Sequence, residues 1–222
     1  APAAIAFATS PDDVIPPWTP VTYNAGTVGV WNRTLKLNGL GLLKQIDNGG
    51  VSQVRKMRIV AVKDGKPVEV IPSEPTLTRQ VGAAVTVEGT GEGAGLQLRA
   101  QRKVEFDGFV LSRLTIGPGS APAKIDKLSL EIEFPESEAT HFCTTSGGWA
   151  AIHDATPPYW SSQTTSSGLL IGDFVPYIWL TNSDRAFVWF ADNDKGWVID
   201  ANSDADADAS FVADFERFTH GF

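Results

Sequence analysis

Several short segments of the chain alternate apolar and polar residues with a period of two. The clearest is Leu128–Phe134, LSLEIEF, whose apolar positions are separated by one Ser and two Glu. Successive side chains of a strand point to opposite faces, so this pattern predicts a strand with one face on a core and the other in water. Residues 27–31 and 34–37 alternate in the same way, between turns rich in Asn and Gly.

Two Asp-Gly pairs mark predicted hairpins. Asp64-Gly65 separates the apolar run 54–62 from 67–71, and Asp107-Gly108 lies between two longer strand-like runs. An Asp-Gly turn favours a hairpin because a type I′ turn requires positive φ at both central residues.

A third hairpin is predicted within Gly172–Trp197, the part of the chain richest in aromatic residues. Two apolar runs, Phe174–Leu180 and Ala186–Ala191, flank the turn-forming residues Thr181–Asp184. We expect the Trp residues of this stretch to fill a core: Trp179, Trp189 and Trp197.

No segment carries a helical stripe of useful length, and the chain contains 21 Gly and 14 Pro. The predicted fold class is therefore all-β, a large antiparallel β-sandwich of two sheets with little helix. Residues 1–20 are expected to form an extended lead-in. Residues 21–222 are expected to form a single sandwich domain, a length that all-β domains often reach.

Composition narrows the function classes. The net charge of −8 argues against a nucleic-acid partner, which requires a basic face. No apolar run approaches the roughly 20 residues of a membrane helix. Cys143 is the single cysteine, so no internal disulfide is expected. The first residues fit either a mature N-terminus after signal cleavage or a boundary within a longer protein.

The aromatic-rich stretch resembles the β-sandwich N-terminal region that precedes the catalytic barrel in glycoside hydrolase family 123-like proteins. The residues that carry this resemblance are Gly172, Phe174, Pro176, Trp179, Leu180, Arg185, Trp189, Phe190, Ala191, Gly196 and Trp197. Upstream, Glu105–Gly108 and the strand 128–134 followed by His141 are also similar to the family. Thr181, Ala186-Phe187 and Asp192 depart from its pattern.

The resemblance implies that the parent protein hydrolyses N-acetylated hexosamine linkages with acidic residues of a separate barrel, assisted by the substrate itself. This chain contains no Asp-Glu dipeptide, and its strand pattern does not provide a (β/α)8 barrel. The resemblance therefore implies a secreted, periplasmic or cell-surface protein whose catalytic centre lies outside this chain.

Candidate glycan-binding residues lie in 139–168, which is predicted to be a long aromatic-bearing loop. They are Trp149, His153, Tyr159 and Trp160. Aromatic rings bind sugars because the axial C–H groups of the sugar meet the negative face of the ring.

Two acidic turns are candidate Ca²⁺ sites, although no cofactor is required by the predicted fold. Asp192 and Asp194 precede Gly196 as in the first half of a calcium loop, but Asn202 stands where the closing Glu is expected. Asp204, Asp206 and Asp208 alternate with Ala. The alternative interpretation is a hairpin turn and a solubilising loop.

The sequence gives weaker evidence for catalytic residues than for binding residues. Paired acids for glycoside cleavage would come from Asp154, Asp173, Asp184, Asp192 and Asp194. His153-Asp154 lacks a Gly-x-Ser-x-Gly elbow, and Cys143 near His141 is more typical of a buried structural thiol.

Three functions follow in order of preference. The first is a non-catalytic accessory domain that packs against the catalytic barrel and shapes its cleft. The second is a free-standing carbohydrate-binding module that uses the loop aromatics. The third is a cell-surface or filament subunit that self-assembles through exposed strands. An autonomous hydrolase is last.

Overall fold

A computed structural model of the chain describes residues 10–146, 149–154, 177–191 and 213–214. The chain divides into two compact units. The first contains the residues up to Ser52 and Val70–Ala123, and the second contains Gln53–Glu69 and the residues from Lys124 onward. The expectation of a single sandwich domain over 21–222 stays a prediction.

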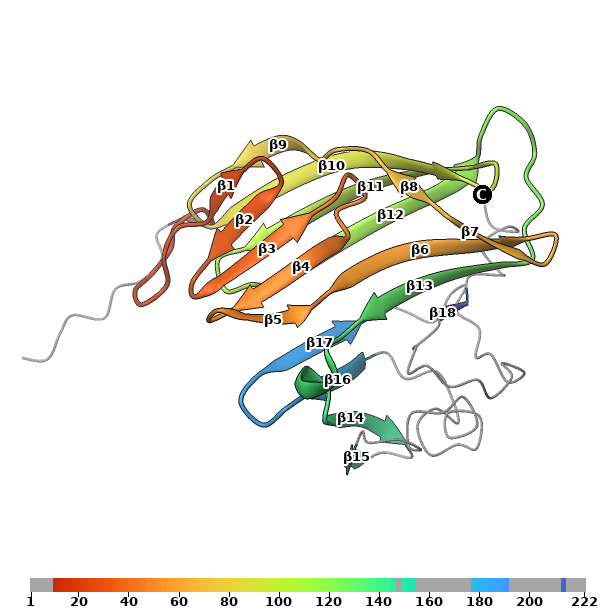
Figure 1. Cartoon of the computed structure of the whole chain (residues 1–222). Coiled ribbons are helices and arrows are strands. Elements are labelled where there is room, and N and C mark those ends of the chain that lie inside the picture. The colour runs from red at the N-terminus through yellow and green to blue at the C-terminus, as the bar shows by residue number, and fades with distance from the viewer. Residues whose placement is uncertain (1–9, 147–148, 155–176, 192–212, 215–222) are drawn as a thin grey trace, which may run out of the picture. The chain divides into compact units, whose positions relative to one another are not determined.

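The first unit contains two antiparallel sheets (Figure 1). The strands of one sheet lie in chain order: β1 (Thr22–Asn24), β2 (Thr27–Val30), β3 (Arg33–Leu37), β4 (Leu43–Asn48) and β5 (Val51–Val54), in which the boundary between the units falls. The other sheet has the order β12-β11-β10-β8, with β9 also paired to β10. Its strands are β8 (Ile71–Pro72), β9 (Thr76–Gln80), β10 (Ala84–Gly93), β11 (Leu96–Glu105) and β12 (Val110–Pro118).

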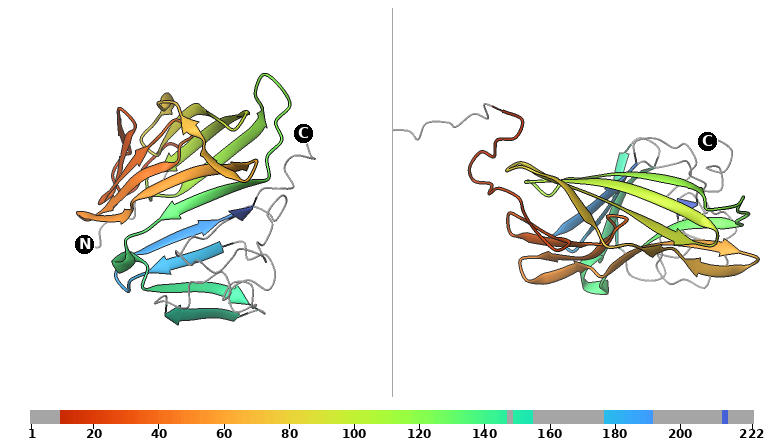
Figure 2. Two further views of the ribbon diagram at one scale, coloured as in Figure 1. Left: turned by 45° about the vertical axis from the view of Figure 1, so that its right-hand side comes forward. Right: turned by 90° about the horizontal axis from the view of Figure 1, so that it is seen from above.

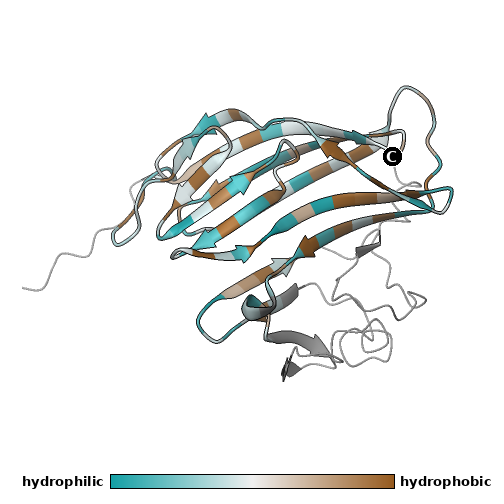
Figure 3. Cartoon of the chain, in the orientation of Figure 1, coloured by the Kyte–Doolittle hydropathy of each residue, from teal (hydrophilic) through white to brown (hydrophobic). Residues whose placement is uncertain are grey.

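The core of the first unit is built by alternation along these strands, which Figure 3 shows as alternating colours. On β11 the even-numbered residues from Leu96 to Val104 are buried, and their odd-numbered neighbours from Gln97 to Gln101 are exposed. Side chains from both sheets form this core, including Val28, Leu37, Val85 and Leu98. Because each sheet buries one face, the arrangement is a β-sandwich and confirms the predicted fold class.

A close backbone contact joins the two sheets of this unit. The turn after β3 lies against β10, where a Cβ added to Gly89 would lie 2.1 Å from the carbonyl oxygen of Gly39. The turn is held by Asn38, whose Oδ1 accepts hydrogen bonds from the N–H groups of Leu40 and Leu42, each at 3.0 Å. Only glycine at position 89 allows this approach.

The second unit contains two four-stranded antiparallel sheets. One has the order β18-β13-β6-β7, formed by β6 (Lys56–Lys63), β7 (Lys66–Glu69), β13 (Lys127–Glu133) and β18 (Ala213–Asp214). The other has the order β15-β14-β16-β17, formed by β14 (His141–Ser146), β15 (Trp149–Asp154), β16 (Tyr177–Thr181) and β17 (Ala186–Phe190). A single 3-10 turn, η1 (Glu136–Glu138), is the helical element of the described residues.

The three predicted hairpins are confirmed. Lys63 pairs with Lys66 across the first turn, in which Asp64 and Gly65 both have positive φ. Val104 pairs with Val110 around Asp107-Gly108, and β16 pairs with β17. The described residues contain no helix that is long and apolar enough to cross a membrane.

Two expectations need correction. Residues 139–168 are not one long loop, because β14 and β15 form a hairpin within them, with His141 opposite Asp154. Ser129 was expected on a solvated face, but only 4% of it is exposed. Leu128 and Ser129 point to opposite faces of β13 and are both buried, so both faces of the strand are covered at this point.

Candidate functional site

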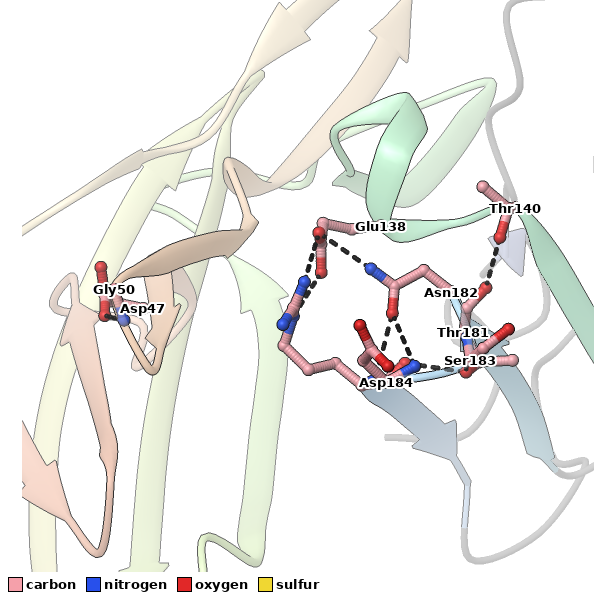
Figure 4. Close-up of polar contacts among 9 residues, drawn as sticks. Asp47, Gly50, Glu138, Thr140, Thr181, Asn182, Ser183 and Asp184 are labelled. Carbon is pink, nitrogen blue, oxygen red and sulfur yellow. Dashed lines mark hydrogen bonds and ion pairs between the residues drawn. The ribbon is translucent and has the colours of Figure 1, made fainter.

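The hairpin of β16 and β17 closes through a turn in which side chains replace backbone partners. The Oδ1 atom of Asn182 accepts hydrogen bonds from the N–H groups of Asp184 (3.2 Å) and Arg185 (3.0 Å). Ser183 has a φ of 80°, and its N–H donates to the hydroxyl of Thr181 at 3.2 Å. Asn and Ser favour such turns because their short side chains bond to nearby backbone groups. Figure 4 shows these contacts.

A buried carboxylate holds this turn in place. Glu138 of η1 is 3% exposed and accepts two hydrogen bonds from the Arg185 guanidinium, from Nε at 2.9 Å and Nη2 at 3.1 Å. The Asn182 amide donates a third at 3.0 Å (Figure 4). The hydrogen bond with Glu138 raises the pKa of Arg185. A bidentate pair fixes orientation as well as distance, so the hairpin is anchored to the segment before β14.

The two faces of the hairpin differ in burial. On the inner face, Leu180 is buried and lies opposite Phe187, whose ring packs edge-to-face on Phe134 with centroids 5.2 Å apart. On the other face, Trp179 lies opposite Val188, and these side chains are 48% and 40% exposed.

Trp179, Val188 and the equally exposed Phe190 form what we call the hairpin apolar face. The prediction that Trp179 fills the core is wrong. Neighbouring residues of a strand face opposite ways, and at this hairpin Leu180 and Phe187 occupy the buried side. Trp189 is half-buried, and Trp197 lies outside the described residues.

The predicted binding residues are only partly described. Trp149 and His153 stand on β15 rather than in a loop, and only the backbone of that strand is described. Tyr159 and Trp160 lie outside the described residues, as do the five candidate calcium ligands, Asp192, Asp194, Asp204, Asp206 and Asp208. Their roles in glycan and calcium binding stay predictions.

Several of the described acidic residues form ion pairs with basic residues. In the second unit, Glu131 binds Arg58 at 2.6 Å and Glu69 binds Lys56 at 3.0 Å. The hydrogen bond that Arg58 donates to Glu131 raises the pKa of Arg58. Of the proposed catalytic acids, Asp184 lies in the hairpin turn and Asp154 ends β15, whereas the other three are outside the described residues. Within the described ranges, no three His, Cys, Asp or Glu residues gather in a way that would hold a metal ion.

Comparison with known families decides the identity of the domain. The family description "Glycoside hydrolase 123, third domain" matches residues 21–174, which is more than half of the chain. The chain belongs to the glycoside hydrolase 123 family. A search of curated proteins finds no match.

The residues that match the glycoside hydrolase 123 domain differ from the residues that first suggested the family. The match begins at residue 21 and ends at 174, so it includes the whole sandwich of the first unit and stops before β16. Most of the aromatic motif that suggested the family lies beyond it. The N-terminal strands, which contributed no residue to the resemblance, are part of the family domain.

Sequence reasoning missed Glu138, the partner of Arg185. Arg185 belonged to the motif, but its carboxylate lies 47 residues earlier in the chain. A polar residue within an otherwise apolar hairpin signals a buried partner, although the sequence does not show which one.

Proposed function

We propose that this chain is a non-catalytic accessory domain of a glycoside hydrolase, which packs against the catalytic barrel of the same protein and shapes one wall of its substrate cleft. The observation that carries the proposal is the family match over residues 21–174, whose description as a third domain places it among other domains. The parent protein acts on glycans outside the cytoplasm in this proposal.

The hairpin apolar face supports the docking part of this function. Trp179 and Val188 lie opposite each other and are both substantially exposed. Leaving these side chains in water is costly, since burial stabilises by about 25 cal/mol per Å² of apolar surface. The Glu138–Arg185 pair keeps the face in a single orientation before any partner binds. Interfaces use such rigid aromatic anchors.

The occupant we assign to this face is the catalytic domain of the same polypeptide. The face is apolar and lies on the edge hairpin of its sheet, so it suits a contact between domains rather than a sugar, which requires several polar partners beside a ring.

The test is to mix the purified chain with the separately produced catalytic domain of its parent protein and to measure association by calorimetry. We expect micromolar or tighter binding that Trp179→Ala weakens by about tenfold or more, as for the truncation of an interface anchor. Trp31→Ala is the matched control, because Trp31 is 46% exposed in the first unit.

Hydrolysis of N-acetylhexosaminide substrates by the catalytic domain is measured in the same mixtures, and we expect this chain to raise it. Absence of association at high micromolar concentration would refute docking. Hydrolysis by this chain alone would refute the non-catalytic role.

A further inference from the structure

A hollow lies on the outer face of the sheet formed by β9, β10, β11 and β12, entirely within the first unit. It has a volume of about 470 Å³ and is open to solvent. The residues that matter for its chemistry are Thr76, Glu88, Thr90, Arg99, Gln101 and Arg113. The right-hand view of Figure 2 shows the strands of this sheet, yellow to green, from above.

The strand register explains why these residues meet. Glu88 of β10 lies opposite Gln101 of β11, which lies opposite Arg113 of β12. In the adjacent row, Arg99 lies between Thr90 and Thr115. Side chains two residues apart on a strand share a face, so both rows point outward.

Arg99 and Arg113 differ from the other basic residues of this outer face in their ion pairs. The other basic residues of this outer face have partners: Arg79 binds Asp12 at 2.9 Å and Lys103 binds Glu105 at 2.6 Å. Neither Arg99 nor Arg113 forms an ion pair with a carboxylate among the described residues. Their strand positions are diagonal neighbours, about 7–8 Å apart by Cα, and the nearby Glu88 carboxylate accepts a hydrogen bond from Gln101 at 2.7 Å.

We propose that this hollow binds an acidic oligosaccharide, with Arg99 and Arg113 on its carboxylate or sulfate group. A guanidinium presents a planar fork that matches both anions, and two such forks on one face repel each other until an anion lies between them. Arg99 and Arg113 outnumber the single carboxylate of the lining, Glu88, so the hollow is locally positive in a chain of net charge −8. This charge is complementary to an anionic ligand rather than to a neutral one.

The remaining lining suits the neutral part of a sugar. Threonine hydroxyls both donate and accept hydrogen bonds, and Gln101 carries an amide with both functions. These groups line the hollow beside the arginines. The hollow extends across four strands, roughly 14 Å at the spacing of about 4.8 Å between strands, which is room for a short oligosaccharide.

Calorimetric titration of the intact chain tests this proposal with four probes: a tetragalacturonate, a sulfated chondroitin tetrasaccharide, neutral tetra-N-acetylchitotetraose and inorganic sulfate. We expect one or both acidic tetrasaccharides to bind, more weakly as NaCl is raised. Carboxylate and sulfate recognition are distinguished by which of the two binds more tightly.

Arg99→Gln and Arg113→Gln should each weaken the binding by about tenfold or more, because each removes a charge-assisted hydrogen bond. Lys66→Gln removes the same charge from an exposed position on β7 and should change the affinity by less than about twofold. Arg113→Lys keeps the charge but loses the fork, so an intermediate affinity is expected.

Several results would overturn the proposal: no binding of either acidic tetrasaccharide, equal binding of the neutral one, equal binding of sulfate alone, or an equal loss of affinity in Lys66→Gln. The hollow and the hairpin apolar face belong to different units, so the failure of one proposal leaves the other standing.

Discussion

Arg102 provides the sharpest test of how the first unit is stabilised. It points inward from β11, is 5% exposed and has no hydrogen-bond partner at Nε. Burial lowers its pKa well below the usual value for arginine, to about 10. At about 1.36 kcal/mol per pKa unit, burial of the charged guanidinium costs about 3 kcal/mol at neutral pH.

Arg102→Met removes the charge and keeps an unbranched apolar stem, which adapts to irregular packing. The stem of Arg102 packs closely on Gly41, since a Cβ added to Gly41 would lie 2.8 Å from the Cβ of Arg102. A shorter side chain at position 102 would lose this packing. We expect a gain of about 1–3 kcal/mol in the free energy of unfolding, as for other buried charges replaced by apolar residues. Urea denaturation measures it as a higher midpoint with an unchanged m-value.

Arg99→Met is the matched control, since Arg99 lies on the same strand and faces outward. Its change in unfolding free energy should stay within about 0.5 kcal/mol. A lower midpoint for Arg102→Met than for the wild type would refute the reasoning, because it would show that the guanidinium makes net stabilising contacts.

The pH dependence provides a second check. The pKa of Arg102 is lower in the folded state than in the unfolded state, so the unfolded chain binds this proton more tightly. The destabilisation is therefore complete below about pH 10 and is relieved as pH rises from there toward the usual pKa of arginine. Between about pH 6 and 9, the difference between wild type and Arg102→Met should stay constant.

Two further predictions concern close packing and the buried carboxylate. Gly89→Ala should destabilise the chain by about 1–3 kcal/mol or more, because its Cβ would meet the Gly39 carbonyl. Gly117→Ala, where nothing lies within 4 Å of the added Cβ, should be nearly neutral. Equal urea midpoints for Gly89→Ala and Gly117→Ala would contradict the close contact at Gly89. Glu138→Gln leaves Arg185 without its carboxylate and should lower the melting temperature by several degrees. The exposed Glu133→Gln provides the comparison by thermal denaturation, and equal melting temperatures would show that the Glu138–Arg185 pair does not anchor the hairpin.

Local patterns were sufficient to predict three hairpins and their turns, but not the hairpin of β14 and β15. Asp64-Gly65 adopts the two positive φ angles that its turn requires. On β11 the apolar positions of the alternating pattern are all buried, and the one exception to the pattern is the buried, charged Arg102. These features depend on neighbours in the chain, so the sequence shows them directly.

Partners distant in the chain were not predictable. The pairing of Glu138 with Arg185 and the row Glu88–Gln101–Arg113 both depend on strand register. Register is set by turns and by the burial of whole faces, and no local pattern identifies which residues will stand opposite each other.

The sequence by itself determined the all-β class and the positions of three hairpins, because the period-two alternation and the turn residues act over a few residues. Its motifs also pointed to the family. Only the tertiary structure decided which aromatic side chains are buried. Trp179 is as apolar as any core residue, yet it is 48% exposed because Leu180 and Phe187 occupy the packed face of its hairpin. The side of a strand that becomes the core depends on what packs against it, and that is a property of the folded chain.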